Sequence, residues 1–122
     1  MPGTETINRE QLEKKLSETL PDNGDQRNGY ALVNVLGRQA FEREHIPHSI
    51  SIPLGEIERC EKRFDRDKEI VVYCASYDCE AAPKAALKLE KAGFRKILDY
   101  EGGMKDWKEA GNEVVVSEQA SI

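Results

Sequence analysis

The chain has 122 residues, which is the size of one ordinary domain and nearly excludes two. Its 18 basic and 23 acidic residues give a net charge of −5, the wrong sign for a protein that binds nucleic acid through phosphate contacts. A hydrophobic content of 39% beside 34% charged residues is typical of a chain that folds, so disorder is also excluded. We therefore expect one domain spanning residues 1–122, with its core over about 7–115 and a polar tail at 117–122.

Helix and strand signals alternate along the chain. Asn8 and Gln11 have the spacing of a capping box, which predicts where the first helix begins. The unbroken apolar run at 70–73 predicts a strand covered on both faces, and Gly93 predicts the left-handed residue that ends a helix. The predicted elements in chain order are a helix at 9–19, a strand at 30–35, one or two helical turns at 39–44, a strand at 50–52, a short charged helix between 54 and 64, a strand at 70–73, a helix at 80–92, a strand at 97–100, a helix around Trp107 and an edge strand at 114–116.

This alternation predicts an α/β layer fold with a mostly parallel sheet. In such sheets, functional sites form where the carboxyl ends of the strands meet. Because residues 70–73 form the most buried of the predicted strands, the segment after Tyr73 is the first place to look for a site.

The first twenty residues contain no apolar run of the kind that an export signal needs. The longest apolar run, residues 70–75, is far shorter than the roughly 20 residues that cross a bilayer, so we expect no membrane association. Three cysteines without an export signal predict reduced thiols in the cytoplasm rather than a disulfide scaffold. Thiol chemistry is therefore the first kind of function to consider.

Cys74 lies between the buried strand and the next helix. A thiol in that place faces backbone N–H groups of the loop and the positive end of the helix, and both stabilise a thiolate or a bound anion. The alternative is that Cys74 is only a small buried residue at the end of a strand, since free cysteine is among the most buried residue types. Position alone favours neither interpretation.

Several other kinds of thiol site do not fit the sequence. A cysteine phosphatase needs an arginine six residues after its cysteine, where this chain has Glu80. A thioredoxin-like site needs CxxC, and the spacing between Cys74 and Cys79 is CxxxxC. The same spacing does not suit zinc, and we expect His45 and His48 to belong to a turn rather than to a metal site.

Five segments, in their order and spacing, resemble the rhodanese homology domain. They are LVNV at 32–35, FEREHIPHSISIPL at 41–54, IVVYC at 70–74, AGF at 92–94 and EGGMKDW at 101–107. The resemblance covers about residues 7–115. It implies a single rhodanese-like domain built on a five-stranded parallel sheet with helices on both faces.

The resemblance also implies a function. Cys74 matches the family's catalytic cysteine, which takes a sulfane sulfur to become a persulfide and passes it to a thiol or cyanide-like acceptor. The loop after it matches the family's active-site loop, whose amides cradle the terminal sulfur. That loop comprises Ala75, Ser76, Tyr77, Asp78 and Cys79. Neither a cofactor nor a metal is expected, and the oligomeric state is left open.

The chain departs from the family at the loop. Where many members have an arginine or a small polar residue, this chain has Cys79, and two carboxylates, Asp78 and Glu80, stand beside it. Two charges about 4 Å apart interact by about 4 kcal/mol at an effective dielectric near 20, against about 0.3–1 kcal/mol for a helix terminus. A close Asp78 would therefore oppose an anionic donor. We expect a small persulfide or a protein persulfide, rather than thiosulfate, to be the best donor.

Asn34-Val35-Leu36 stands where the family often has Asp-Val-Arg, so we expect an ion pair of the family to be missing. The start of the helix after the loop is also open. If it begins at Pro83 the loop is long and loose, and if it begins near Glu80 the proline lies strained in the first turn.

Cys79 suggests a second role. Its thiol could attack a persulfide on Cys74, release sulfide and leave a disulfide between the two cysteines, which would make the loop redox-sensitive. The alternative is that Cys79 is only a small residue at a helix start, out of reach of Cys74. Cys60, in a charged helix, is expected to have no chemical role. The rival to a sulfurtransferase is a rhodanese fold used as a binding or regulatory module without turnover.

Overall fold

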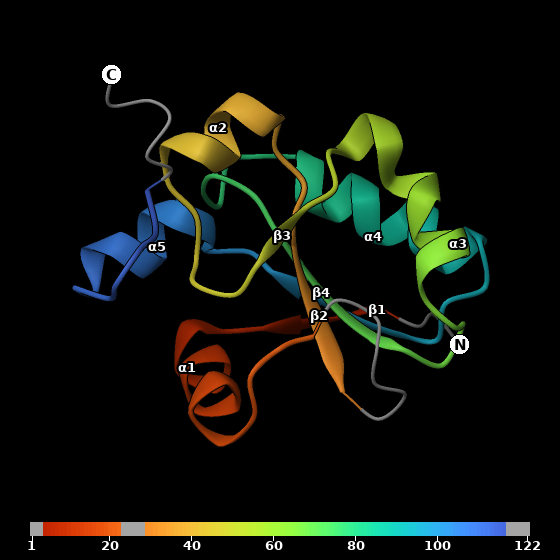
Figure 1. Ribbon diagram of the computed structural model, residues 1–122, viewed down its shortest axis with the longest axis horizontal. Helices are drawn as coiled ribbons and strands as arrows, with labels where there is room; N and C mark the ends of the chain where they lie inside the picture. The colour runs from red at the N-terminus through yellow and green to blue at the C-terminus, as the bar shows by residue number, and fades with distance from the viewer. Residues whose placement is uncertain (1–3, 23–28, 117–122) are drawn as a thin grey trace.

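The computed structural model describes residues 4–22 and 29–116, in which a parallel sheet lies between two layers of helices (Figure 1). The elements in chain order are β1 (Thr4–Ile7), α1 (Arg9–Glu18), β2 (Tyr30–Asn34), α2 (Arg38–Arg43), β3 (Ile50–Ser51), the 3-10 helix η1 (Leu54–Arg59), α3 (Cys60–Arg63), β4 (Glu69–Tyr73), α4 (Ala81–Lys91), β5 (Lys96–Tyr100) and α5 (Gly103–Glu109).

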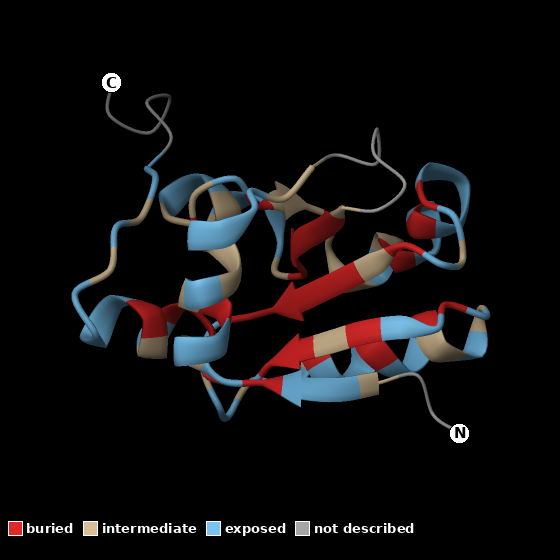
Figure 2. Ribbon diagram, turned by 90° about the horizontal axis from the view of Figure 1, so that it is seen from below, coloured by how far each residue is buried: buried red, intermediate tan, exposed pale blue. Residues whose placement is uncertain are grey.

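The sheet has five strands in the order β1-β5-β4-β2-β3, and each pairing between neighbours is parallel. This order places β4 at the centre, where Ile70 to Tyr73 are fully buried (Figure 2). The predicted fold class, a parallel α/β sheet with helices on both faces, is therefore confirmed. All five strands end at the same edge of the sheet, because parallel strands run in one direction.

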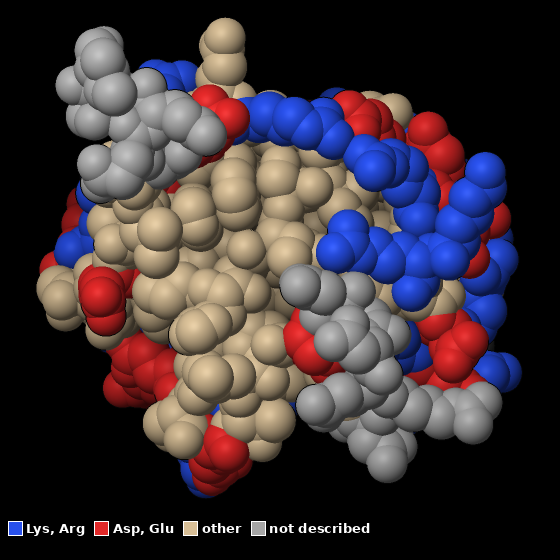
Figure 3. All heavy atoms as spheres, viewed as in Figure 1, with Lys and Arg blue, Asp and Glu red and all other residues tan. Residues whose placement is uncertain are grey.

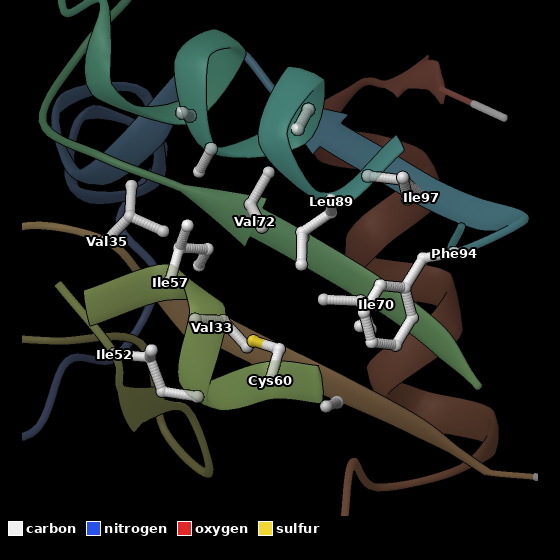
Figure 4. Packing of buried hydrophobic residues seen from close by; sticks show 14 of the residues in the cluster. Val33, Val35, Ile52, Ile57, Cys60, Ile70, Val72, Leu89, Phe94 and Ile97 are labelled. Atoms are coloured by element: carbon white, nitrogen blue, oxygen red, sulfur yellow. The ribbon is translucent and has the colours of Figure 1, made fainter. Parts of the chain in front are cut away.

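Alternate residues of β4 face two separate hydrophobic cores. Ile70 and Val72 pack with Leu89 of α4 on one face of the sheet (Figure 4). Val71 and Tyr73 point the other way, into a core that contains Leu12 of α1 and Trp107 of α5. Both faces of the central strand are thus covered, as its unbroken apolar run predicted.

Cys60 is part of the first core. Its side chain is completely buried beside Val33 (Figure 4), and burial raises its pKa to about 12. The charged helix that carries it turns Ile57, Cys60 and Phe64 inward and exposes Glu58, Glu61 and Lys62. The structure thus gives Cys60 a role in packing.

The fifth strand lies elsewhere than the sequence predicted. Residues 114–116 form no strand, and Val115 makes only an isolated antiparallel bridge with His45, with N–O distances of 3.0 and 2.9 Å. The sheet is completed instead by β1, which pairs with β5. Three of the four β1 residues are not buried, so this edge strand has little apolar signal to reveal it.

Candidate active site

Cys74 directly follows β4, at the carboxyl edge of the sheet. α4 then begins at Ala81, with Glu80 as its N-cap residue, so the helix starts before Pro83. The proline occupies the first turn, where a backbone N–H has no partner within the helix, so the missing N–H breaks no helical bond. Of the two predicted starts, the earlier one is correct. The loop between strand and helix is therefore short.

The side chains of Cys74 and Cys79 are in contact. The Cys74 thiol is 2% exposed and donates a hydrogen bond to the Cys79 carbonyl oxygen, with sulfur and oxygen 3.6 Å apart. The two thiols also affect each other's ionisation, because the Cys79 side chain raises the pKa of Cys74 and Cys74 lowers the pKa of Cys79. Both cysteines are free, and Cys79 is partly exposed. The sequence left open whether Cys79 lies within reach of Cys74. In the structure the two cysteines lie next to each other.

Backbone amides at the start of α4 lie around the two sulfurs, and the pKa values of the two thiols shift in opposite directions. Burial and then the Cys79 side chain raise the pKa of Cys74 to about 12, against hydrogen bonds from the amides of Ala82 and Ala75. Burial also opposes ionisation of Cys79, but hydrogen bonds from Cys74 and from the amides of Ala75, Ala81 and Ala82 outweigh it and lower the pKa of Cys79. Of the two thiols, Cys79 is therefore the one that ionises at the lower pH.

The N-terminus of α5 holds the other side of the loop. The Met104 amide donates to the carbonyl oxygen of Cys74 at 2.9 Å, and the Lys105 amide donates to that of Ala75 at 2.8 Å. Gly103 makes this approach possible: it has a φ of +63°, and an added Cβ would lie 2.4 Å from the Cys74 oxygen. In the sequence, Gly103 stands out only as part of the EGGMKDW segment. Its contact with the loop is long-range and leaves no local pattern.

A buried polar network fixes the strand end next to Cys74. The Tyr73 hydroxyl accepts hydrogen bonds from the Ile46 amide at 3.1 Å and from Nδ2 of Asn34 at 3.2 Å. It also lies 2.7 Å from Oγ of Ser49, whose own proton goes to the Ile46 carbonyl, so Tyr73 is the donor to Ser49. Oδ1 of Asn34 accepts the Leu36 amide at 2.9 Å. Asn34 thus acts through neutral hydrogen bonds, which fits the expected absence of the family's ion pair.

The carboxylates of the loop lie at its surface. Asp78 and Glu80 are exposed, and Glu80 is 3.4 Å from the ammonium of Lys84. The pKa of Cys74 is governed by burial, by Cys79 and by backbone amides. Asp78 is not among the groups that shift the pKa of Cys74, so the repulsion of an anionic donor expected from a close Asp78 has no counterpart at this thiol.

Cations missing from the loop are supplied by other elements. A cleft of about 690 Å³ lies between α2 and α5 and reaches the loop at Ala75. Its apolar wall is formed by Leu36, Ala40, Ala75 and Met104, and its charged rim by Arg43, Glu44, Lys105, Lys108 and Glu109. Lys108 is paired with Glu44 at 2.8 Å, whereas Arg43 and Lys105 have no carboxylate partner within the described part of the chain. The sequence did not reveal this cleft, because its residues are distant along the chain.

Other cations gather over α3 on the face shown in Figure 3, whose centre is largely uncharged. Arg59 pairs there with Glu56 at 2.8 Å, and Arg66 approaches Glu61 at 3.4 Å. These pairs balance much of the positive charge, so this surface is no equivalent of the cleft.

His45 packs against the end of α2. His45 stacks on Phe41, and its Nδ1 lies 2.8 Å from the Phe41 carbonyl oxygen. Within residues 4–22 and 29–116, no three side chains of His, Cys, Asp or Glu come close enough together to hold a metal ion. No described helix is both long and apolar enough to cross a membrane.

The fold and the site together place the chain among α/β proteins that carry a cysteine at the carboxyl end of the central strand. The sulfur of this cysteine lies among backbone amides. The family model for the rhodanese-like domain matches residues 10–110. The chain belongs to the rhodanese-like family.

Two relatives have names that refer to sulfur chemistry. YrkF of Bacillus subtilis (strain 168), whose name assigns it to the sulfur carriers, is 33% identical over 76 residues, which are 62% of this chain and 40% of YrkF. Thiosulfate sulfurtransferase GlpE of Pseudomonas syringae pv. syringae (strain B728a) is 35% identical over 80 residues, which are 66% of this chain and 74% of GlpE. The match thus spans less than half of YrkF and most of GlpE.

Solved structures share the fold. The BH2092 protein from Bacillus halodurans superposes with a TM-score of 0.78 and 29% identity, covering 92% of this chain and 77% of that one. A rhodanese-related protein from Thermoplasma volcanium gives a TM-score of 0.71 with 28% identity, covering 92% and 98% of the two chains.

Proposed function

We propose that the protein is a sulfurtransferase or persulfide carrier that binds a sulfane sulfur on Cys74. The observation that carries this proposal is the position of the Cys74 sulfur, at the carboxyl end of β4 and within reach of the Ala75 and Ala82 amides. Such amides stabilise the anionic sulfur of a persulfide. Family membership and relatives named as a sulfur carrier and a thiosulfate sulfurtransferase support the same activity.

The reaction has two transfers. The Cys74 thiolate attacks the outer sulfur of the donor, a bond forms between the two sulfurs, and the donor's former partner leaves with the bonding electrons. An acceptor thiolate or cyanide then attacks the outer sulfur, and Cys74 leaves as a thiolate. Cys74 must lose its proton before the first transfer, although burial and the Cys79 side chain raise its pKa to about 12. Cys79, whose pKa is lowered, is the neighbouring group that can accept this proton.

The proposed donor is a small persulfide or a protein persulfide. The loop from Ala75 to Glu80 contains no cationic side chain, so a dianion such as thiosulfate would meet amides there, while the cations Arg43 and Lys105 lie in the adjoining cleft and not in the loop. We expect kcat/KM with thiosulfate to fall well below kcat/KM with a low-molecular-weight persulfide. Equal values for the two donors would refute this preference. Three free thiols fit a reducing compartment such as the cytoplasm.

Intact mass spectrometry after incubation with a sulfane donor tests the main proposal. The protein should gain the mass of one sulfur atom, Cys74→Ser should abolish the gain, and Cys60 should stay unmodified because it is fully buried. The second candidate is a binding module without turnover, which the 2% exposure of Cys74 favours. Failure to gain sulfur from persulfide, polysulfide and thiosulfate alike would support the module and contradict the sulfurtransferase.

A further inference from the structure

From the contact between the two thiols we infer that Cys79 discharges a persulfide on Cys74 as sulfide, leaving a disulfide between Cys74 and Cys79. The inference rests on the proposed function, because it needs a persulfide on Cys74. It adds a second activity to sulfur transfer, namely the release of sulfide with no external acceptor.

The loop folds so that Cys79 returns to Cys74. The Cys79 amide donates to the Ser76 carbonyl oxygen at 3.1 Å, and the Asp78 amide lies 3.3 Å from Oγ of Ser76. This turn brings the carbonyl oxygen of Cys79 to within 3.6 Å of the Cys74 sulfur, with the Cys79 side chain close enough to shift the pKa of Cys74. Attack by one sulfur on the other therefore needs no large movement of the loop.

Cys79 also occupies the amides that an outer sulfur would use. The amides of Ala75 and Ala82 interact with both thiols, and the amide of Ala81 interacts with Cys79 as well. An outer sulfur on Cys74 must compete with the Cys79 sulfur for these same donors. When Cys79 is ionised, the amide site can therefore hold its thiolate beside the inner sulfur of the persulfide, in competition with the outer sulfur.

The chemistry balances without an oxidant. The Cys79 thiolate attacks Sγ of Cys74, a bond forms between the two cysteine sulfurs, and the bond from Sγ to the outer sulfur breaks. The outer sulfur, which carries the proton of the persulfide (S–SH), leaves with the electron pair as hydrosulfide, so it is reduced by two electrons while the two cysteines are oxidised to a disulfide. During loading, the donor's leaving thiolate takes the proton from Cys79. A thiol reductant, which is itself oxidised to a disulfide, restores the two cysteines.

The exposure of the two cysteines fits their roles, with Cys74 binding the sulfur and Cys79 attacking the persulfide. Cys79 is partly exposed, so a thiol reductant can reach its sulfur, whereas Cys74 is nearly inaccessible. Cys60 is fully buried in the core between α3 and the sheet, so it is not available to take the place of Cys79.

The test is a time course on the full chain, loaded with a low-molecular-weight persulfide and then freed of reagent. In the absence of acceptor and reductant, the wild type should release one equivalent of sulfide. Its mass should fall from that of the persulfide to that of the reduced protein less two hydrogen atoms. Cys79→Ser, which keeps a small polar side chain but has no thiol, should retain the extra sulfur at least about tenfold longer. Peptide mapping should join Cys74 to Cys79.

The outcomes separate this inference from the proposed function. If the wild type and Cys79→Ser hold the extra sulfur equally long and release no sulfide, the inference is overturned and the sulfur carrier stands. If neither protein gains sulfur from any donor, the proposed function fails and the inference fails with it. Sulfide release from the wild type with mixed disulfides on Cys74, rather than a bond to Cys79, would also overturn the inference.

Discussion

Gly103 lies against the backbone of Cys74, so close that a Cβ on Gly103 would be 2.4 Å from the Cys74 carbonyl oxygen. The same added atom would lie 2.8 Å from the carbonyl carbon of Ala75 and from the amide nitrogen of Ser76. These neighbours are backbone atoms, which cannot turn aside as the end of a flexible side chain can. The active-site loop and the N-terminus of α5 thus share one close contact, which only glycine permits.

Gly103→Ala is therefore predicted to move the loop. The substitution adds both a clash and the cost of a positive φ, and we expect sulfur loading on Cys74 to slow by at least about tenfold, a barrier change of about 1.4 kcal/mol. Gly111→Ala is the matched control, because Gly111 also has a positive φ but nothing lies within 4 Å of its added Cβ. The control should cost about 1–2 kcal/mol of stability and leave loading unchanged. Equal loading defects in both variants would contradict the prediction.

The two thiols are predicted to differ in their reaction with iodoacetamide. Because Cys79 has a lowered pKa and Cys74 has one raised to about 12, peptide mapping should find Cys79 alkylated first near neutral pH. Alkylation of Cys74 should keep rising toward pH 12. The Cys79 side chain raises the pKa of Cys74, so Cys79→Ser should shift the Cys74 profile to lower pH. A Cys74 profile that stays in place in this variant would show that the two thiols do not interact.

Asp99 should make the protein less stable at neutral pH than at mildly acidic pH. Burial and then the charge of Glu101 raise its pKa to about 6, and its Oδ1 has no hydrogen-bond partner within the described residues. Between pH 4 and 6 the folded state then binds more protons than the unfolded state, so the free energy of unfolding falls as the pH rises. Asp99→Asn should add about 2 kcal/mol at pH 8 and almost nothing at pH 4, measured by urea unfolding.

Glu101→Gln provides a check on this cause. Removing the nearby charge should recover part of the stability at pH 8, because Glu101 contributes to the raised pKa of Asp99. If neither variant alters the pH dependence of unfolding, Asp99 is not the group responsible.

The charges on the rim of the cleft should act on the KM for anionic acceptors. With a thiol acceptor that carries a carboxylate, Arg43→Ala and Lys105→Ala should each raise KM by about two- to fivefold, the range of an exposed charge interaction. Glu109→Gln, which removes a negative charge from the same rim, should lower KM. An uncharged thiol acceptor should respond to none of the three changes. The same increase in KM for both acceptors would place the effect in the fold rather than in charge.

Most elements could be predicted because they have local signals. The capping box at Asn8 and Gln11 is confirmed, with reciprocal hydrogen bonds of 2.8 and 2.9 Å, and Gly93 has the positive φ expected at the end of α4. By contrast, β1 buries only Ile7 among its four residues, so its place at the edge of the sheet had no apolar pattern. The valines at 114–116 had such a pattern but are not part of the sheet.

The candidate site was predictable only in part, because some of its contacts join segments that are distant along the chain and leave no local signal. The position of Cys74 follows from a local succession of strand, loop and helix. The role of Gly103 and the cations of the cleft depend on α2 and α5 meeting the loop in space. The contact between Cys74 and Cys79 depended on where α4 begins, and Pro83 left two possibilities until the helix was seen to start at Ala81.

The hydrogen bond from the Met104 amide to the Cys74 carbonyl oxygen sets the direction of the peptide dipole between Cys74 and Ala75. The peptide that links Cys74 to Ala75 is planar and trans, so its C=O and N–H groups point to opposite sides. When α5 fixes the carbonyl on one side, the Ala75 N–H is turned toward the sulfurs on the other. A segment far along the chain from Cys74 therefore sets the orientation of one of the dipoles that meet the reacting sulfur.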